Sequence, residues 1–442
     1  MSFYKVTYHC PQDYAHNRVT INKSAEGRDS STMVVSNTSP KAPNDACIIA
    51  FIRTPLCRAR KGGLAKLPPS TLLSTALKSI LDSQKKQVNG ISPSDIGDIC
   101  VGNVLSPASG AAALRMACLQ SGIPSSVPMS TTNRQCSSGL QAVAHIASSI
   151  EAGNITIGIG AGVESMSTHP MNKIPMPDVD WDAMQQCQEA MDCLIPMGVT
   201  SENVSKKYGQ TREELDRFAV MSHRRAAAAQ ESGKFENEIV PVGNIYKDDG
   251  IRSNTTMKTL SKLKPVFDKE KGTTTAGNAS QMTDGAASIL LMARSEAERR
   301  NLPILATWRG YEVAGVPPKI MGIGPAVAIP KLLHKCNLTV PDINLYEINE
   351  AFASQALYSI ETLGIDINSV NVNGGAISLG HPLGATGARQ IATVLNEMRR
   401  RKNSKSPYCV ISMCIGTGMG AAALLEIEDG LYQSQSNFKS SL

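Results

Sequence analysis

The feature that most constrains the fold is an internal repeat, because the second half of the chain follows the same order of segments as the first. Residues 92–103 and 339–349 each begin with a polar turn containing Pro and Asp and continue into an apolar run ending at an asparagine. Each copy then predicts a strand, a glycine-containing loop, an alanine-rich helix and a further strand. One such match would be weak, but the matches recur in the same order. We therefore predict a duplicated domain with pseudo-twofold symmetry.

Strands and helices are expected to alternate along both copies, which favours an α/β fold with a buried sheet. The first apolar run, 46–52, is typical of a buried strand. The other strands expected are 127–132, 155–159, 370–373 and 408–412, and the helices expected around them are 138–152 and 388–398.

Composition and pattern divide the chain into five parts. The ends are polar, and residues 166–280 interrupt the repeat with several Met and Pro residues and an amphipathic helix at 211–230. We expect this interruption to be an inserted loop domain that covers a ligand. The predicted parts are a flexible N-terminal extension or targeting segment (1–44), the N-terminal half (45–165, completed by about 281–297), the inserted domain (166–280), the C-terminal half (298–428) and a polar tail (429–442).

The composition narrows the possible functions. Aromatic residues are only 4% of the 442, which argues against a nucleic-acid stacking surface. The net charge of +6 suits a phosphate-bearing substrate. The 11 cysteines form no CxxC pair, which argues against zinc sites and disulfides and favours a reducing compartment. No apolar run approaches the roughly 18 residues of a membrane span.

Cys136, in the segment Asn133–Gly139, is the first candidate for chemistry. It falls where a predicted strand ends and a predicted helix begins, and the free N–H groups and dipole of a helix start favour a thiolate. Gly139, one turn into the helix, would let a ligand or the facing domain approach closely. We predict that Cys136 is a nucleophile; the alternative is a buried structural cysteine.

Three further segments carry candidate groups. Five glycines in 373–387 indicate a loop, which places His381 before a helix start, where it can take a thiol proton or donate to an oxyanion. The alternative is a capping loop with an incidental histidine. Segment 412–420 lacks the spacing of a dinucleotide loop, so its Cys414 is interpreted as a second thiol acting as acid or base. Asn349 could hold a water molecule or donate a hydrogen bond.

Together, the motifs NRQCSSG, NEAF, GHPLGATG and CIGTGMG resemble the thiolase family, most closely the peroxisomal 3-ketoacyl-CoA thiolases, over about residues 46–428. The resemblance implies the α/β thiolase fold, in which two similar βαβ-type halves form αβαβα layers with an inserted loop domain. It implies CoA-dependent cleavage of 3-ketoacyl-CoA to acetyl-CoA and a shortened acyl-CoA in fatty acid beta-oxidation. CoA would be a substrate, no cofactor or metal is expected, and the chain would form a homodimer or a tetramer.

The resemblance also implies roles for individual residues. Cys136 would become acylated, and Cys414 would exchange a proton with the acetyl-CoA carbon. His381 would activate Cys136 and form one oxyanion hole with a water held by Asn349, while the backbone N–H groups of Cys136 and Gly416 would form another. The CoA contacts expected are Arg252 and Thr259 at the nucleotide end, Ala279 and Ser280 at the pantetheine, and Met197 and Phe352 at the reactive end.

Alternatives to this interpretation stay open. Pro196 stands where short-chain biosynthetic relatives carry a histidine, which favours degradative thiolysis over a biosynthetic acetoacetyl-CoA thiolase. From another class, the chain could be an inactive CoA-binding scaffold. The resemblance favours a peroxisome or related organelle, with the mitochondrion as alternative, and the terminal segments around Lys5–Gln12 and 440–442 only partly match peroxisomal addresses.

Overall fold

The computed structural model describes residues 40–85 and 90–433. Most of the predicted extension and tail lies outside these residues. Ten strands of the described chain form one hydrogen-bonded sheet in the order β4-β3-β5-β6-β1-β7-β10-β9-β8, with β2 paired to β6. They are β1 (Ala46–Arg53), β2 (Cys57–Arg58), β3 (Asp98–Gly102), β4 (Met129–Thr132), β5 (Ile157–Ser165), β6 (Thr283–Ala293), β7 (Ala306–Gly315), β8 (Ile343–Ile348), β9 (Tyr408–Ile415) and β10 (Met419–Ile427).

The helices are long or short, and most of the long ones cover the sheet. The long helices are α1 (Pro69–Lys85), α2 (Ala111–Gln120), α3 (Ser138–Glu151), α6 (Met197–Tyr208), α7 (Arg212–Glu231), α10 (Gly324–Lys335), α11 (Ala353–Leu363) and α13 (Thr386–Met398). The short ones are α4 (Trp181–Gln185), α5 (Gln188–Asp192), α8 (Met257–Leu260), α9 (Arg294–Arg299), α12 (Ala376–Leu379) and α14 (Gly430–Gln433).

The sheet consists of two similar halves. In the first, β3 pairs in parallel with β4 and β5, and β6 joins β5 to β1 through antiparallel pairs. In the second, β8 pairs in parallel with β9, and β10 joins β9 to β7 through antiparallel pairs. A short antiparallel contact between β1 and β7 connects the halves. This shared pattern agrees with the predicted duplication.

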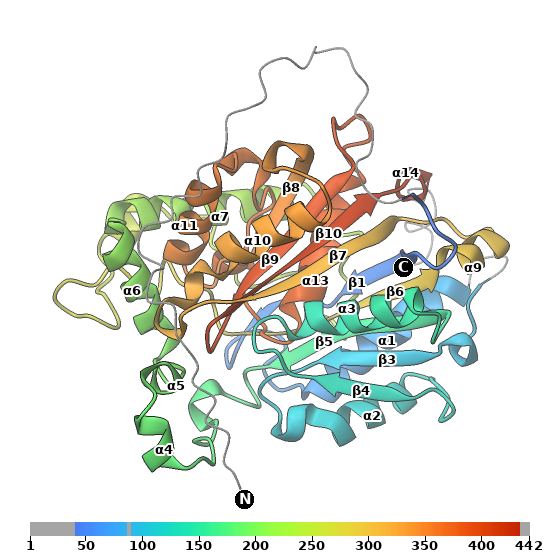
Figure 1. Cartoon of the computed structure of the whole chain (residues 1–442), viewed down its shortest axis with the longest axis horizontal. Coiled ribbons are helices and arrows are strands. Elements are labelled where there is room, and N and C mark those ends of the chain that lie inside the picture. The colour runs from blue at the N-terminus through green and yellow to red at the C-terminus, as the bar shows by residue number, and fades with distance from the viewer. Residues whose placement is uncertain (1–39, 86–89, 434–442) are drawn as a thin grey trace, which may run out of the picture. The chain divides into compact units, whose positions relative to one another are not determined.

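Helices α3 and α13 lie between the two halves of the sheet (Figure 1). Leu140 and Val143 of α3 and Ile391 and Leu395 of α13 belong to one buried core with side chains of β1, β6, β9 and β10. Helices α1 and α2 pack on the other face of the first half, and α10 and α11 on that of the second. The predicted αβαβα layering is therefore confirmed.

Two glycines let the central helices cross with their backbones in contact. A Cβ atom at Gly139 would lie 2.5 Å from the carbonyl oxygen of Gly384, and one at Gly387 would lie 2.4 Å from the nitrogen of Leu140. Contacts this short leave no room for a side chain. The close approach of the facing half at Gly139 is as predicted.

The strand predicted at 370–373 is wrong. Val370 forms only an isolated parallel bridge with Tyr346, and the chain then turns toward α12. Asn371 adopts a left-handed φ of 45°, which interrupts an extended chain. Its side chain accepts a hydrogen bond from the backbone N–H of Ile348 and donates one to the carbonyl of Ile348. The side-chain amide of Asn371 thus makes the hydrogen bonds to Ile348 that the backbone of a paired strand would otherwise make.

The segment between β5 and β6 forms a lobe with four of the described helices, α4 to α7, and the short α8. The amphipathic helix predicted at 211–230 is α7, and it begins with a capping box between Thr211 and Glu214. Helix α7 packs against α11 and α12 of the second half. In the described part of the chain, none of the helices is both long and apolar enough to cross a bilayer.

Candidate active site

Cys136 lies in a tight turn between β4 and α3. Gln135 adopts a left-handed φ of 47°, and the Ser138 hydroxyl accepts from the Arg134 N–H and donates to the Gln135 carbonyl. The turn therefore holds Cys136 two residues before the helix start. Its side chain is 9% exposed and packs in a small apolar cluster with Met166 and Leu383.

The Cys136 thiol is not ionised in the substrate-free protein at neutral pH. Burial raises its pKa to about 11, although the backbone N–H groups of Gly416 and of Cys136 itself lower it. Burial thus opposes the thiolate that the helix start was expected to favour. The physical reason is that a buried thiolate loses its hydration, and the two N–H groups compensate for only part of that loss.

Gly416 lies in the turn between β9 and β10, beside the Cys136 turn. A Cβ atom at Gly416 would lie 3.6 Å from Met197 Sδ and 3.8 Å from Gln135 Cγ. The backbone N–H groups of Cys136 and Gly416 both lower the pKa of the Cys136 thiol, against the effect of burial. The oxyanion hole expected from these two N–H groups stays a prediction.

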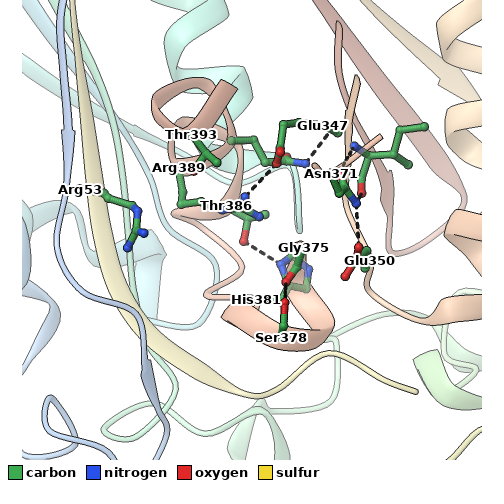
Figure 2. A network of polar contacts seen from close by, with 12 residues as sticks. Arg53, Glu347, Glu350, Asn371, Gly375, Ser378, His381, Thr386, Arg389 and Thr393 are labelled. Carbon is green, nitrogen blue, oxygen red and sulfur yellow. Dashed lines mark hydrogen bonds and ion pairs between the residues drawn. The ribbon is translucent and has the colours of Figure 1, made fainter. Parts of the chain in front are cut away.

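His381 is buried, and its tautomer follows from its hydrogen bonds. Its Nδ1 lies 2.7 Å from the Thr386 hydroxyl, which donates its own proton to the Pro382 carbonyl at 3.2 Å. Because Nε2 faces the N–H donor of Asn349, the proton of the neutral ring is on Nδ1 and the Thr386 hydroxyl accepts it, a contact that Figure 2 shows. The other ring nitrogen, Nε2, keeps a lone pair and lies 3.3 Å from Asn349 Nδ2.

The imidazole of His381 is neutral at physiological pH. Burial, and secondly the charge of Arg389, lowers its pKa to about 3. Arg389 lies one turn after Thr386 on α13, and its guanidinium donates a hydrogen bond to the Glu347 carboxylate at 2.9 Å (Figure 2). A neutral imidazole that carries its proton on Nδ1 can accept a second proton at Nε2.

Glu164 ties the loop that carries His381 to the nucleophile's surroundings. Its buried carboxylate accepts from Gly384 N at 3.0 Å, from Val104 N and from Leu105 N. Burial raises its pKa to about 7, and these N–H groups oppose that shift. Val104 and Leu105 also pack against the cluster around Cys136. One side chain therefore fixes loops from both halves.

Asn349 follows β8 and is 2% exposed. Its backbone N–H donates to the Ser412 carbonyl at 2.9 Å, which sets its position against β9. Its Oδ1 has no hydrogen-bond partner among the residues that the structure describes. A buried acceptor of this kind next to an imidazole fits a bound water molecule. The expected role in an oxyanion hole stays a prediction.

Cys414 lies near the end of β9 and is fully buried. Burial raises the pKa of its thiol, and the neighbouring Cys136 raises it further. The thiol donates a hydrogen bond to Gln355 Oε1 at 3.1 Å. The side chains packed around it are Met321, Ala351, Met197, Val316 and Phe352. Burial thus favours the uncharged form of both thiols.

The residues expected to bind CoA fall into two groups. Ala279 forms a bridge with Phe352, and the Ser280 N–H donates to the Ala351 carbonyl at 2.9 Å. Ala279, Ser280, Phe352 and Met197 therefore gather at Cys414.

Arg252 and Thr259 are exposed residues of the lobe. The Thr259 hydroxyl takes part in the capping box of α8 with Thr256. The Arg252 backbone N–H donates to His223. Among the residues that the structure describes, no hydrogen bond joins either of them to the gathered group, and all the expected CoA contacts stay predictions.

Three residues at the site were not singled out from the sequence. Thr386 lies in the glycine-rich segment with His381, and Gln355 follows the NEAF motif by three residues, so proximity in sequence could have suggested both. Glu164 lies inside an apolar strand, and the only sequence feature that could have pointed to it is the presence of an acidic residue there.

Comparison with known proteins gives a consistent result. Residues 46–295 match the family model described as "Thiolase, N-terminal domain", and residues 302–427 match "Thiolase, C-terminal domain". The chain is 51% identical to 3-ketoacyl-CoA thiolase 5, peroxisomal, of Arabidopsis thaliana over 416 residues, covering 90% of this chain and 89% of that protein.

Solved structures agree with these matches. The dimeric peroxisomal thiolase of Saccharomyces cerevisiae has a TM-score of 0.82 at 45% identity, covering 88% of this chain and 99% of that one. Human mitochondrial 3-ketoacyl-CoA thiolase in complex with CoA has a TM-score of 0.77 at 36% identity, covering 87% and 98%. This chain belongs to the thiolase family.

Proposed function

We propose that this protein is a 3-ketoacyl-CoA thiolase that uses CoA to cleave 3-ketoacyl-CoA into acetyl-CoA and a shortened acyl-CoA. The observation that carries the proposal is that two buried free thiols stand on adjoining turns: Gly416, two residues after Cys414, meets Gln135, the residue before Cys136, with 3.8 Å between an added Cβ and Gln135 Cγ. One thiol can carry an acyl group while the other moves a proton, and His381 supplies a neutral base. The relative from Arabidopsis bears this activity in its name.

The first step forms the acyl carrier. His381 Nε2 takes the Cys136 proton, and the sulfur attacks C3 of the substrate. The backbone N–H groups of Cys136 and Gly416 stabilise the oxyanion that develops on the C3 oxygen. The C2–C3 bond then breaks, which leaves an acyl group on Cys136 and the enolate of acetyl-CoA.

The second part releases both products. The enolate oxygen is stabilised by the protonated His381 and by a water on Asn349, and Cys414 gives its proton to C2. A new CoA thiol passes its proton to the Cys414 thiolate and attacks the acyl group. Cys136 leaves as a thiolate and regains its proton from His381, so all groups return to their initial states. Exclusion of water from these buried groups protects the thioester from hydrolysis.

The nucleophile is tested by Cys136→Ala. We expect no measurable thiolysis from a folded protein, and no adduct at position 136 after brief exposure to acyl-CoA by mass spectrometry. Cys187→Ala is the matched control, because Cys187 is an exposed cysteine outside the site. Substantial thiolysis by Cys136→Ala would refute the assignment.

The acid is tested by Cys414→Ala. We expect loss of C–C cleavage while Cys136 is still acylated from an acyl-CoA. If both half-reactions fail in a folded variant, Cys414 has another role. An unmodified Cys136 in the parent protein would instead favour the CoA-binding scaffold.

Substrate length separates degradative thiolysis from a biosynthetic acetoacetyl-CoA thiolase. Apolar side chains surround Cys136, namely Met166, Leu383, Ala59, Val104 and Leu105. An apolar environment of this kind suits an apolar acyl group on the sulfur, and Pro196 stands where short-chain biosynthetic relatives carry a histidine. We expect higher kcat/KM on medium- or long-chain 3-ketoacyl-CoA than on acetoacetyl-CoA, and the reverse order would favour the biosynthetic enzyme.

We infer a peroxisomal homodimer. The Arabidopsis relative is named peroxisomal, and the yeast structure is described as dimeric. Light scattering should give about twice the 47.1 kDa of one chain. A fluorescent fusion should co-localise with a peroxisomal marker, and a mitochondrial pattern would overturn that assignment.

A further inference from the structure

Cys414 has one side-chain hydrogen-bond partner in the described structure, the amide of Gln355. The thiol lies 3.1 Å from Gln355 Oε1, within the range for a sulfur donor, and both side chains are at most 1% exposed. Gln355 lies in the first turn of α11, six residues after Asn349 in the sequence. A fully buried amide in contact with a proposed acid is a structural feature that the mechanism above does not use.

The remaining surroundings confine this amide without binding it strongly. Its Nε2 lies 3.8 Å from Met321 Sδ, and a thioether is a weak acceptor. A Cβ atom at Gly322 would lie 2.2 Å from Gln355 Cγ, so the glutamine occupies the space that a side chain at 322 would need. The side chain of Gln355 is therefore held in place by packing. Its N–H group can still leave Met321 for another acceptor at little cost in free energy.

The two ends of an amide suit the two protonation states of a thiol. A carbonyl oxygen can accept from S–H but would repel a thiolate, whereas an N–H group stabilises a thiolate. Cys414 passes between these states when its S–H bond breaks, a C–H bond forms at C2 of the enolate and the negative charge stays on sulfur. A buried thiolate without a donor would be costly.

We propose that Gln355 is a positioning residue for Cys414, whose amide accepts from the thiol before proton transfer and turns to donate Nε2–H to the thiolate afterwards. The proposal rests on the function proposed above. Rotation about the terminal side-chain bond exchanges oxygen and nitrogen without moving the chain. The lost contact is only the weak one with Met321.

The first test is Gln355→Met, which keeps the length of the side chain and removes both hydrogen-bonding atoms. Two half-reactions are measured separately: deuterium exchange at C2 of acetyl-CoA, which needs Cys414, and acylation of Cys136 by an acyl-CoA. We expect thiolysis and C2 exchange to fall about 10- to 100-fold, within the contribution of a positioned acid or base. Acylation should stay within about twofold of the parent.

The second test is Gln355→Glu, which is nearly isosteric. The protonated carboxyl can donate and accept as the amide does, but the ionised carboxylate opposes a thiolate. We expect C2 exchange by this variant to decline with rising pH across the range in which the introduced carboxyl ionises, a decline that the parent lacks. A purely structural role for Gln355 would not produce this difference in pH profile.

The control is Ser359→Ala on the same helix. The Ser359 hydroxyl donates to the backbone carbonyl of Gln355 at 3.0 Å and does not touch its amide. We expect this variant to perform both half-reactions at the parental rates. A loss seen only in the Gln355 variants then comes from the amide and not from a disturbed helix.

The inference is overturned if Gln355→Met exchanges C2 hydrogens at the parental rate, or if both half-reactions of that variant fall in the same proportion. If Gln355→Met does not fold, an unchanged pH profile of Gln355→Glu overturns it equally. A parent protein that performs no thiolysis would contradict the proposed function instead, so the two failures are distinguishable.

Discussion

At the scale of single residues, the site keeps its reactive groups neutral until substrate arrives. Burial holds the proton on Cys136 and keeps the His381 imidazole neutral, with pKa values of about 11 and about 3. An ion pair between them would require two charges in a poorly hydrated pocket. The thiolate therefore forms only when a substrate carbonyl is present to receive the charge.

This arrangement predicts how Cys136 reacts with iodoacetamide in the free protein. Because its pKa of about 11 lies above the tested range, the thiolate fraction should grow about tenfold per unit between pH 7 and 9. The rate is measured by peptide mass spectrometry, which separates Cys136 from the exposed Cys187. A rate that levels off below pH 8 would show that the resting nucleophile is a thiolate after all.

The contact between Thr386 and His381 gives a second residue-scale prediction. Thr386→Val keeps the branched shape but removes the acceptor for Nδ1–H, so the proton can move to Nε2 and block the base. We expect kcat/KM to fall about tenfold, equivalent to a lost hydrogen bond of about 1.4 kcal/mol. Thr386→Ser retains the hydroxyl and should remain near the parent. Equal activities of the two variants would contradict the tautomer assigned here.

At the scale of elements, the sequence predicted what local patterns determine. Helices α3 and α7 and strand β1 were found because periodicity, caps and apolar runs are local signals. The strand expected at 370–373 failed because Asn371 is fixed by a contact with Ile348, far away in sequence. The motifs located the loops of the site, but not which side chains meet. Gln355 and Thr386 became visible only once the loops were placed.

The crossing of α3 and α13 gives a prediction at this scale. In Gly139→Ala the new Cβ would meet the Gly384 carbonyl at 2.5 Å, and backbone atoms cannot rotate away as a side chain can. We expect unfolding free energy to fall by about 1–3 kcal/mol. Activity should fall as well, because Gly384 belongs to the loop that carries His381. Both are measured by urea denaturation and thiolysis assays.

The control for this crossing is Gly315→Ala. An added Cβ at Gly315 meets nothing within 4 Å. A Gly139→Ala protein as stable as Gly315→Ala would show that the helices can separate without cost.

At the scale of the whole molecule, buried polar links hold the lobe to both halves. Arg53 of β1 donates to Glu238 at 2.6 Å and makes a bidentate contact with Asp248, both in the lobe. Glu238 also accepts from Thr393 of α13 at 3.1 Å. Similarly, Glu350 after β8 accepts from Ser222 of α7. The lobe is thus attached at several buried points around the site.

The last prediction concerns Arg53, whose guanidinium is fully buried between two carboxylates. Arg53→Met fills a similar volume but leaves Glu238 and Asp248 without their cation. Since an uncompensated buried charge is far more costly than a missing surface pair, we expect a loss of about 3–5 kcal/mol in unfolding free energy. The comparison is Arg217→Met, which breaks the exposed pair with Glu213 and should cost less than about 1 kcal/mol. Equal losses in urea denaturation would mean that the lobe is held by apolar packing, and that the buried ions contribute no more than a surface pair.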